Sequence, residues 1–173
     1  MDEKALARAI TRISHEILER NKGIQNVVLV GIKRRGAVLA GRIAAKILEV
    51  EGSAPPVYEV DITMFRDDRE RSHGDDAMSS GLNMDVEGKR VIIVDDVLYT
   101  GRTARAAVEA VFSKGRAENI QLAVMVDRGH RELPMRPDYV GKNLPTSRGE
   151  RVLVLVREYD GAEGVAIVKA EKG

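Results

Sequence analysis

The pattern of hydrophobic and polar residues predicts helices and strands that alternate along the chain. From Leu6 to Ile17, apolar residues recur every three or four positions, which is typical of an amphipathic helix over residues 2–22. Short apolar runs rich in β-branched residues predict buried strands. The strands are predicted at Val27–Ile32, Val57–Ile62, Val91–Val94 and Ile120–Val126, and the further helices at 36–49 and Thr103–Ser113. This alternation predicts an α/β fold of the doubly wound type, with a mostly parallel sheet covered on both faces.

Two regions do not follow the alternation. Residues 66–83 carry many charges and small residues without periodicity, so we expect a long mobile loop there. The tail holds two further strand-like runs, Val152–Val156 and Val165–Val168, which we expect to pair at an edge of the sheet. No linker divides the chain, so residues 1–173 are predicted to form one domain.

Composition excludes several classes of function. The 173 residues are 43% hydrophobic and carry a net charge of only +1, which argues against intrinsic disorder. Because the chain has no cysteine and three histidines, disulfides and thiolate or zinc clusters are not expected. No run approaches the roughly 18 apolar residues of a membrane span, so we expect a cytoplasmic protein. Only 3% of residues are aromatic, which disfavours a base-stacking RNA platform.

The segment VIIVDDVLYTGRT at 91–103 carries the clearest chemistry. An apolar strand runs into Asp95 and Asp96, and the turn 100–103 follows where a helix begins. The free N–H groups and the dipole of a helix N-terminus favour an anion such as phosphate. Paired carboxylates accept hydrogen bonds from two vicinal hydroxyls, or hold a divalent cation that bridges them. Together these features indicate a ribose 5-phosphate.

Each part also has an explanation that requires no ligand. The acid pair can be a solvated corner of the fold, and the turn can be an ordinary helix start. The order of apolar run, acid pair, short spacer and TGRT is more specific than any one of them, and the common nucleotide loops GxGxxG and GxxxxGK[ST] are absent. The segment resembles the 5-phosphoribosyl-1-pyrophosphate (PRPP) signature of type I phosphoribosyltransferases.

Further segments extend the resemblance over most of the chain. They resemble the corresponding segments of the bacterial bifunctional pyrimidine operon regulatory protein/uracil phosphoribosyltransferase family. The segments are TRISHEI at 11–17, GIKRRG at 31–36, DITMFRDD at 61–68 and VDRGHRELPMRPDYVGKNLPTSR at 126–148. The resemblance implies a type I phosphoribosyltransferase fold with a lid loop at about 66–83 and a small hood. It also implies synthesis of UMP and pyrophosphate from uracil and PRPP, with Mg²⁺ bound mostly through PRPP and no dedicated protein cage.

The resemblance implies roles for individual residues. Asp95 and Asp96 would hold the ribose hydroxyls and could add Mg²⁺ ligands, and Arg66 in the lid would reach the pyrophosphate. Asp127 and Arg128 would lie on the uracil side, where backbone groups read the base. The PRPP and nucleotide site would further comprise Lys33, Arg34 and Arg35 of the pyrophosphate loop, then Tyr99, Thr100, Gly101, Arg102, Thr103 and the Ala104 amide. The family usually carries Thr where this chain has Arg34, so the loop gains a charge.

Two local charge patterns suggest RNA. The polar stripe of the first helix comprises Lys4, Arg8, Thr11, His15 and Lys22, and for a lone helix a solvated face is the simpler explanation. A second basic excess lies at 128–151. In the family, a basic face of the dimer binds pyrimidine operon leader mRNA, and UMP or UTP strengthens that binding. The matching positions are Thr11, His15, Arg131, Arg136 and Lys142.

The resemblance further implies a homodimer, with a tetramer as the alternative, and neither DNA nor a membrane as a partner. Two other functions stay open at this point: a uracil phosphoribosyltransferase without significant RNA regulation, and a binding protein that keeps the fold with negligible catalysis. The intact acid pair and TGRT turn argue against the second.

Overall fold

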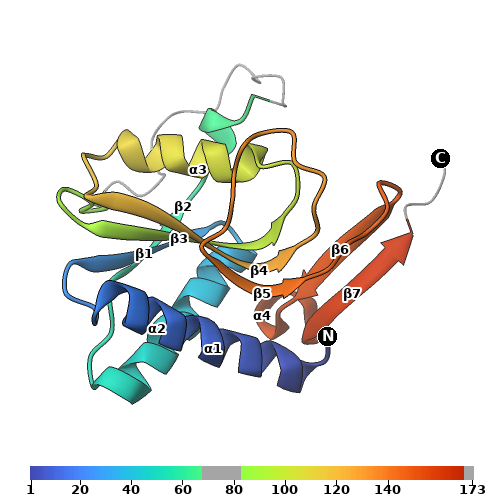
Figure 1. Ribbon diagram of the computed structural model, residues 1–173, viewed down its shortest axis with the longest axis horizontal. Helices are drawn as coiled ribbons and strands as arrows, with labels where there is room; N and C mark the ends of the chain where they lie inside the picture. Colours follow the sequence, from blue (N-terminus) through green and yellow to red (C-terminus); the bar gives the residue numbers. More distant parts are fainter. Residues whose placement is uncertain (68–82, 170–173) are drawn as a thin grey trace.

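A five-stranded parallel sheet forms the centre of the protein (Figure 1). The computed structural model describes residues 1–67 and 83–169. The strands are β1 (Val27–Ile32), β2 (Val57–Val60), β3 (Arg90–Leu98), β4 (Asn119–Asp127) and β5 (Tyr139–Asn143). Their order is β2-β1-β3-β4-β5, and each neighbouring pair is parallel. All five carboxyl ends therefore lie at one edge, where ligands bind in such sheets.

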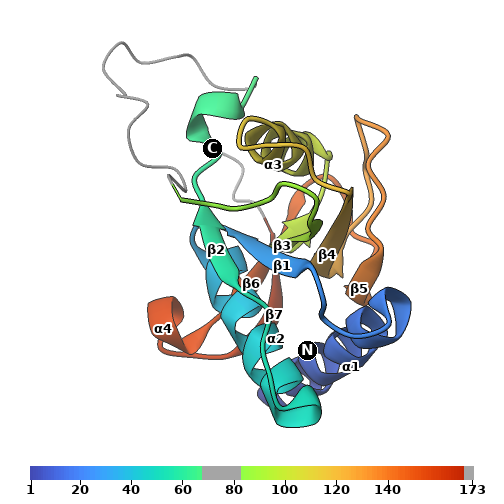
Figure 2. The same cartoon turned by 90° about the vertical axis from the view of Figure 1, so that its left-hand side faces the viewer.

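Helices cover both faces of this sheet, as the alternation predicted. α1 (Glu3–Asn21) and α2 (Arg35–Glu51) lie on one face and α3 (Arg102–Phe112) on the other, which Figures 1 and 2 both show. Each face has its own cluster of buried aliphatic side chains. A 3₁₀ turn, η1 (Thr63–Phe65), follows β2, and a short helix, α4 (Arg157–Asp160), precedes the last strand. Within residues 1–67 and 83–169, no helix has the length and apolar character needed to cross a bilayer.

The prediction for the tail was wrong in one respect. β6 (Glu150–Leu155) and β7 (Gly164–Lys169) pair antiparallel as a separate two-stranded sheet instead of extending an edge of the main one. The edge beside β4 is taken by β5, a strand that the apolar pattern did not reveal. The hairpin is held elsewhere: Val165 N donates to Met1 O at 2.7 Å, and Arg42 of α2 pairs with Glu158 of α4 at 2.7 Å.

Strand β3 is longer than predicted. It continues through the acid pair to Leu98, four residues beyond the predicted end at Val94. Most of the predicted mobile loop, residues 68–82, lies outside the described residues, whereas Arg66 and Asp67 lie within them.

Candidate functional site

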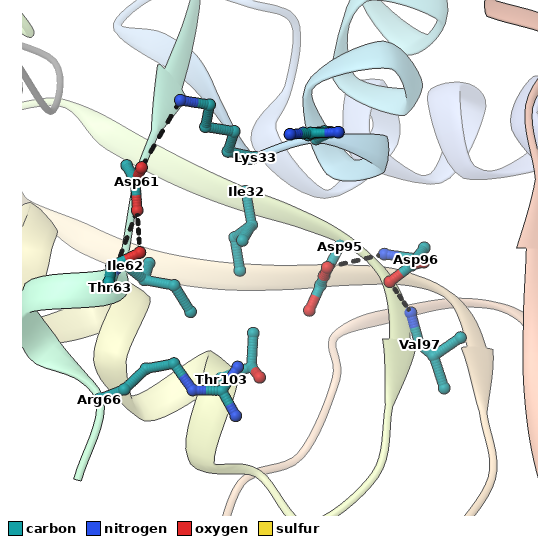
Figure 3. Close-up of a pocket in the computed structure, with 11 residues that line it drawn as sticks. Ile32, Lys33, Asp61, Ile62, Thr63, Arg66, Asp95, Asp96, Val97 and Thr103 are labelled. Atoms are coloured by element: carbon teal, nitrogen blue, oxygen red, sulfur yellow. Dashed lines mark hydrogen bonds and ion pairs between the residues drawn. The ribbon is translucent and has the colours of Figure 1, made fainter. Parts of the chain in front are cut away.

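A cleft of about 500 Å³ opens at the carboxyl edge of the sheet. Figure 3 shows that its lining comes from four parts of the chain: the loop after β1, the segment after β2, strand β3 and the start of α3. The lining residues are Ile32, Lys33, Arg34, Asp61, Ile62, Thr63, Arg66, Asp95, Asp96, Val97 and Thr103. The fold thus brings the predicted acid pair, two residues of the predicted pyrophosphate loop and Arg66 to one place.

The two carboxyl groups of the acid pair have different surroundings. Asp95 is only 8% exposed, and burial, followed by the charge of Asp96, raises its pKa well above the usual value. Asp96 N donates to Asp95 Oδ1 at 2.9 Å, and Val97 N donates to Asp96 Oδ1 at 2.8 Å. Asp96 is half-buried at the cleft. A pair of this kind is suited to vicinal hydroxyls, because each carboxyl group can accept a hydrogen bond from one of them.

The turn before α3 presents backbone donors to a second hollow of about 330 Å³. Gly101 is the N-cap residue of α3, has φ +94° and carries no side chain that could cap the first turn, where Thr100 Oγ1 makes one long contact with Arg102 N. Residues 97–103 line this hollow together with Arg66 and Glu132. Arg66, Val97 and Thr103 line both hollows, so the two adjoin. The arrangement fits an elongated ligand with hydroxyls over the acid pair and an anion at the turn.

Backbone groups dominate this turn. The Arg102 guanidinium is engaged at the rim, where it donates to Glu132 at 2.9 Å and to Asp67 at 2.7 Å. Thr100 Oγ1 accepts from Arg102 N at 3.4 Å. Ala104 is a buried residue of α3 and lines neither hollow, so a contact between its amide and a phosphate stays a prediction.

The first turn of α2 approaches the acid pair closely. A Cβ at Gly36 would lie 2.4 Å from Val94 O and 3.3 Å from Asp95 Cα, so only glycine permits this approach. The Lys33–Arg34 peptide bond is cis, and both residues line the cleft. Arg35, the third basic residue of the predicted pyrophosphate loop, does not line the cleft.

Arg35 makes a two-pronged contact with α4. Its Nη2 and Nε lie 2.6 and 3.2 Å from the two carboxylate oxygens of Asp160. This guanidinium is therefore not among the groups that line the cleft. A role of Arg35 in holding pyrophosphate stays a prediction.

Two polar residues of the cleft, Asp61 and Thr63, were given no role by the sequence. Asp61 accepts from Thr63 N at 3.0 Å and faces Lys33 Nζ at 3.6 Å. Hydrogen bonds from the hydroxyl and the backbone N–H of Thr63 are the main reason why the pKa of Asp61 is lowered, and the charge of Lys33 contributes less. The predicted strand Val57–Ile62 enclosed Asp61, whereas β2 ends at Val60, so both residues follow the strand at the edge where the other site residues meet.

The residues predicted for the uracil side lie at the end of β4, with Asp127 as its last residue and Arg128 directly after it. Arg128 is buried, and its guanidinium stacks 3.9 Å from the centre of the Tyr99 ring while donating to Thr146 Oγ1 at 2.9 Å and Ser147 O at 3.0 Å. Asp127 accepts from Gly129 N at 3.1 Å. Arg128 thus connects Tyr99, just before the predicted phosphate turn at 100–103, to residues 146–147, and its place beside uracil stays a prediction.

Comparison with known proteins agrees with this geometry. The phosphoribosyl transferase domain family matches residues 1–154. The bifunctional protein PyrR of Clostridioides difficile (strain 630) is 57% identical over 168 residues, which cover 96% of this chain and 95% of that protein. The bifunctional protein PyrR 2 of Lactiplantibacillus plantarum is 54% identical and covers 97% of both chains. The chain belongs to the PyrR family of phosphoribosyltransferases.

Solved structures place this PyrR-family chain in the expected fold. A hypoxanthine phosphoribosyltransferase from Staphylococcus aureus superposes with a TM-score of 0.71 over 98% of this chain and 90% of that one, at 20% identity. One from Trypanosoma cruzi gives a TM-score of 0.74 over 99% and 95%, at 16% identity. At such identities the likeness concerns the fold, and it confirms the type I phosphoribosyltransferase architecture predicted from the sequence.

The residues predicted for RNA binding lie on two neighbouring elements of this PyrR-family chain. α1, which carries Thr11 and the exposed His15, lies beside β5, which carries the exposed Lys142 (Figure 2). Arg136 is exposed in the segment leading into β5. Arg131 differs from the other four.

Arg131 is held by three contacts within the protein. Its guanidinium donates to Tyr99 O at 2.8 Å, to Met135 O at 2.8 Å and to Asp127 Oδ2 at 2.6 Å. These bonds connect the phosphate turn with the loop after β4. The structure therefore gives Arg131 an architectural role beside the predicted one.

Proposed function

We propose that the protein converts uracil and PRPP into UMP and pyrophosphate, and that it also regulates pyrimidine genes by binding leader mRNA. The observation that carries the enzymatic part is the pair of adjoining hollows, one over Asp95 and Asp96 and one at the free N-terminus of α3. Their spacing along β3 and the following turn suits the hydroxyls and the 5′-phosphate of one ribose phosphate.

In the proposed reaction, a bond forms between uracil N1 and ribose C1′ while the bond from C1′ to the pyrophosphate oxygen breaks, and the N1 proton is released to water. Positive charge develops on the ribose ring, and negative charge grows on the leaving group. Asp95 and Asp96 orient the ring through its hydroxyls. Lys33 and Arg34 in the loop and Arg66 across the cleft supply cations for the departing pyrophosphate.

Magnesium fits this site through oxygen ligands. Among residues 1–67 and 83–169, no three His, Cys, Asp or Glu side chains gather into a metal cluster. Asp95 or Asp96 would therefore supplement the oxygens of PRPP and water, the ligands that Mg²⁺ prefers. When bound, the ion neutralises charge on the pyrophosphate.

The uracil side rests on backbone groups near 127–130 and 140–142. β5 pairs with β4 up to Asn143, and Leu144 N donates to Asp127 O at 2.8 Å, so the two segments meet beside the phosphate turn. Such a site would read the base by hydrogen bonds that uracil makes and a purine does not.

The regulatory part of the proposal rests on the basic residues of α1 and the segment around β5. Thr11, His15, Arg136 and Lys142 would contact leader mRNA when UMP or UTP is bound, in the cytoplasm and as a homodimer or tetramer. RNA read without aromatic stacking requires charged and hydroxyl groups against a splayed loop. Linkage then requires RNA to tighten nucleotide binding by the same factor.

A uracil phosphoribosyltransferase without RNA regulation is the second candidate. The observation in its favour is Arg131, because one of the five predicted RNA contacts is committed to internal partners.

Two assays test the proposal. Asp96→Asn should sharply reduce UMP synthesis from uracil and PRPP, and unchanged turnover would remove Asp96 from the mechanism. Filter binding of a pyrimidine-leader hairpin at about 150 mM salt, with and without UMP, tests regulation, and a scrambled RNA of equal length is the control. Tight, UMP-enhanced and sequence-selective binding supports the regulator, whereas weak binding indifferent to sequence and UMP leaves only the transferase.

A further inference from the structure

One side chain fastens α1 to the edge strand of the sheet at its middle. Arg12 Nη2 donates to Gly141 O at 2.6 Å and Nη1 donates to Val140 O at 3.1 Å, while Nη1 also lies 2.9 Å from Glu16 Oε1 on the same helix. The planar guanidinium is suited to two successive carbonyl groups, a geometry that a lysine ammonium does not reproduce. Arg12 sits directly beside Thr11 and one turn from His15, the two helix residues predicted to contact RNA.

A buried polar cluster fastens the C-terminal end of the same helix to the same strand. Asn21 Nδ2 donates to Gln121 Oε1 at 3.1 Å and to Tyr139 OH at 3.2 Å, and Tyr139 OH donates to Gln121 Oε1 at 2.6 Å. Tyr139 is the first residue of β5. Because α1 is tied to β5 at two points about 13 Å apart, a displacement of β5 must carry the helix with it.

The other end of β5 reaches the nucleotide site. Tyr99 lines the hollow at the phosphate turn, and its ring stacks on Arg128, which donates to Thr146 and Ser147 just after β5. A continuous series of contacts therefore runs from the phosphate turn through Arg128 and β5 to Arg12. Both predicted binding surfaces lie at the ends of this series.

We propose that Arg12 is a positioning residue that couples the nucleotide site to the RNA surface. The inference rests on the proposed function, and it names the element through which UMP would strengthen RNA binding. A nucleotide that orders the phosphate turn and β5 also sets the orientation of Thr11 and His15, because the two hydrogen bonds of the Arg12 guanidinium hold α1 to β5. A ligand shifts an equilibrium only by its differential affinity for the two conformations of the protein. Weakening the contact between Arg12 and β5 therefore lowers the factor by which UMP strengthens RNA binding.

A direct RNA contact by Arg12 makes a different prediction. The Arg12 side chain is 49% exposed, so a phosphate could reach it. A residue that only contacts RNA weakens binding by the same factor with and without nucleotide. A positioning residue instead changes the ratio of the two affinities.

The test measures RNA dissociation constants with and without saturating UMP for the full-length wild type, Arg12→Lys and Arg12→Gln. We expect the UMP enhancement, which falls between about 5- and 150-fold for ordinary coupled sites, to drop towards one in both variants. The effect of RNA on the UMP dissociation constant should fall by the same factor. Arg8→Gln on the exposed side of α1 is the matched control, with weaker RNA binding at every UMP concentration and an unchanged ratio.

The possible failures are distinct. A wild type without UMP-enhanced RNA binding overturns the proposed regulation and this inference with it. An enhanced wild type with equally enhanced Arg12 variants overturns the inference alone. Equal weakening with and without UMP assigns Arg12 to direct RNA contact and also overturns it. A thermal melt of each variant, together with its UMP binding, establishes that it is folded.

Discussion

Replacing Gly101 with alanine tests the phosphate turn more directly than removal of any side chain there. Gly101 has φ +94°, a backbone conformation that residues with a Cβ rarely adopt. An alanine Cβ at this position would lie 3.0 Å from Met135 Cγ, 3.1 Å from Met135 Cβ and 3.4 Å from Leu133 Cβ. The substitution removes no functional group, so every effect arises from the backbone and its packing.

Two costs combine in this variant. A Cβ in the left-handed region costs roughly 1–2 kcal/mol. Crowding against Met135 adds about 1 kcal/mol, the low end for overpacking, because a methionine side chain adapts. The total is therefore about 2–3 kcal/mol, and it must appear either as lost stability or as a displaced turn.

The two outcomes are measured separately. If the turn keeps its shape, the melting temperature falls by about 4–12 °C, since 1 kcal/mol corresponds to about 2–4 °C for a chain of this size. If the turn relaxes instead, the N–H donors move and the KM for PRPP rises, by about 30-fold for each 2 kcal/mol transferred to binding. Thermal melts and steady-state UMP synthesis on the same preparation measure the loss of stability and the loss of PRPP affinity, respectively.

Gly41→Ala is the matched control for this experiment. Gly41 lies within α2 on an exposed face, and nothing comes within 4 Å of a Cβ built there. The control should gain stability, about 0.5–1 kcal/mol, because alanine favours the helix over glycine. Unchanged melting temperature together with unchanged KM in Gly101→Ala would refute the account of the turn.

Two further predictions concern buried charge and the basic loop. Asp95→Asn should abolish efficient UMP synthesis yet raise the melting temperature of the ligand-free protein at pH 8, because burial and the adjacent carboxylate raise the pKa of Asp95 and its ionisation costs stability. The gain should be absent below the ordinary pKa of 3.8, grow as the pH rises through the raised pKa and then stay constant; a variant no more stable than wild type at pH 8 would contradict this. Arg131→Gln should impair both UMP synthesis and RNA binding, since its guanidinium braces the phosphate turn. Arg136→Gln should reduce only RNA binding, so equal kinetic defects in the two variants would argue against the distinction.

The elements with strong periodicity were predicted closely. The first helix was expected over 2–22 and extends from Glu3 to Asn21, because its buried side chains recur with the period of a helix. The strand Val27–Ile32 was predicted without error, since both of its faces are buried and every residue is apolar or Gly. The place of the acid pair followed from the same reasoning, because polar residues near the carboxyl ends of such strands meet at one edge of a parallel sheet, whereas the roles of the other site residues came from the family resemblance and stay predictions.

The errors occurred where tertiary contacts override local sequence. β5 has the sequence YVGKN, which is short and partly polar, and its place is fixed by pairing with β4 and by the buried Tyr139 hydroxyl. β3 continues through two carboxyl groups because its backbone pairs with β4 on that side as far as Leu98. The tail hairpin had a recognisable strand pattern, but the sequence could not show that another strand already covered the edge it was assigned to.

Arg131 shows why the functional surfaces were harder to separate than the elements. A local excess of basic residues has the same appearance in the sequence whether each guanidinium faces solvent or an internal carbonyl. Arg136 is exposed, whereas the Arg131 guanidinium donates hydrogen bonds to Tyr99 at the phosphate turn, to Asp127 at the end of β4 and to Met135 in the loop that follows. The stretch from Asp127 to Ser147 therefore carries one set of side chains that contact the predicted phosphate turn and another set on the predicted RNA surface. Because both sets stand on one continuous backbone, occupancy of one surface can bias the other without any additional domain.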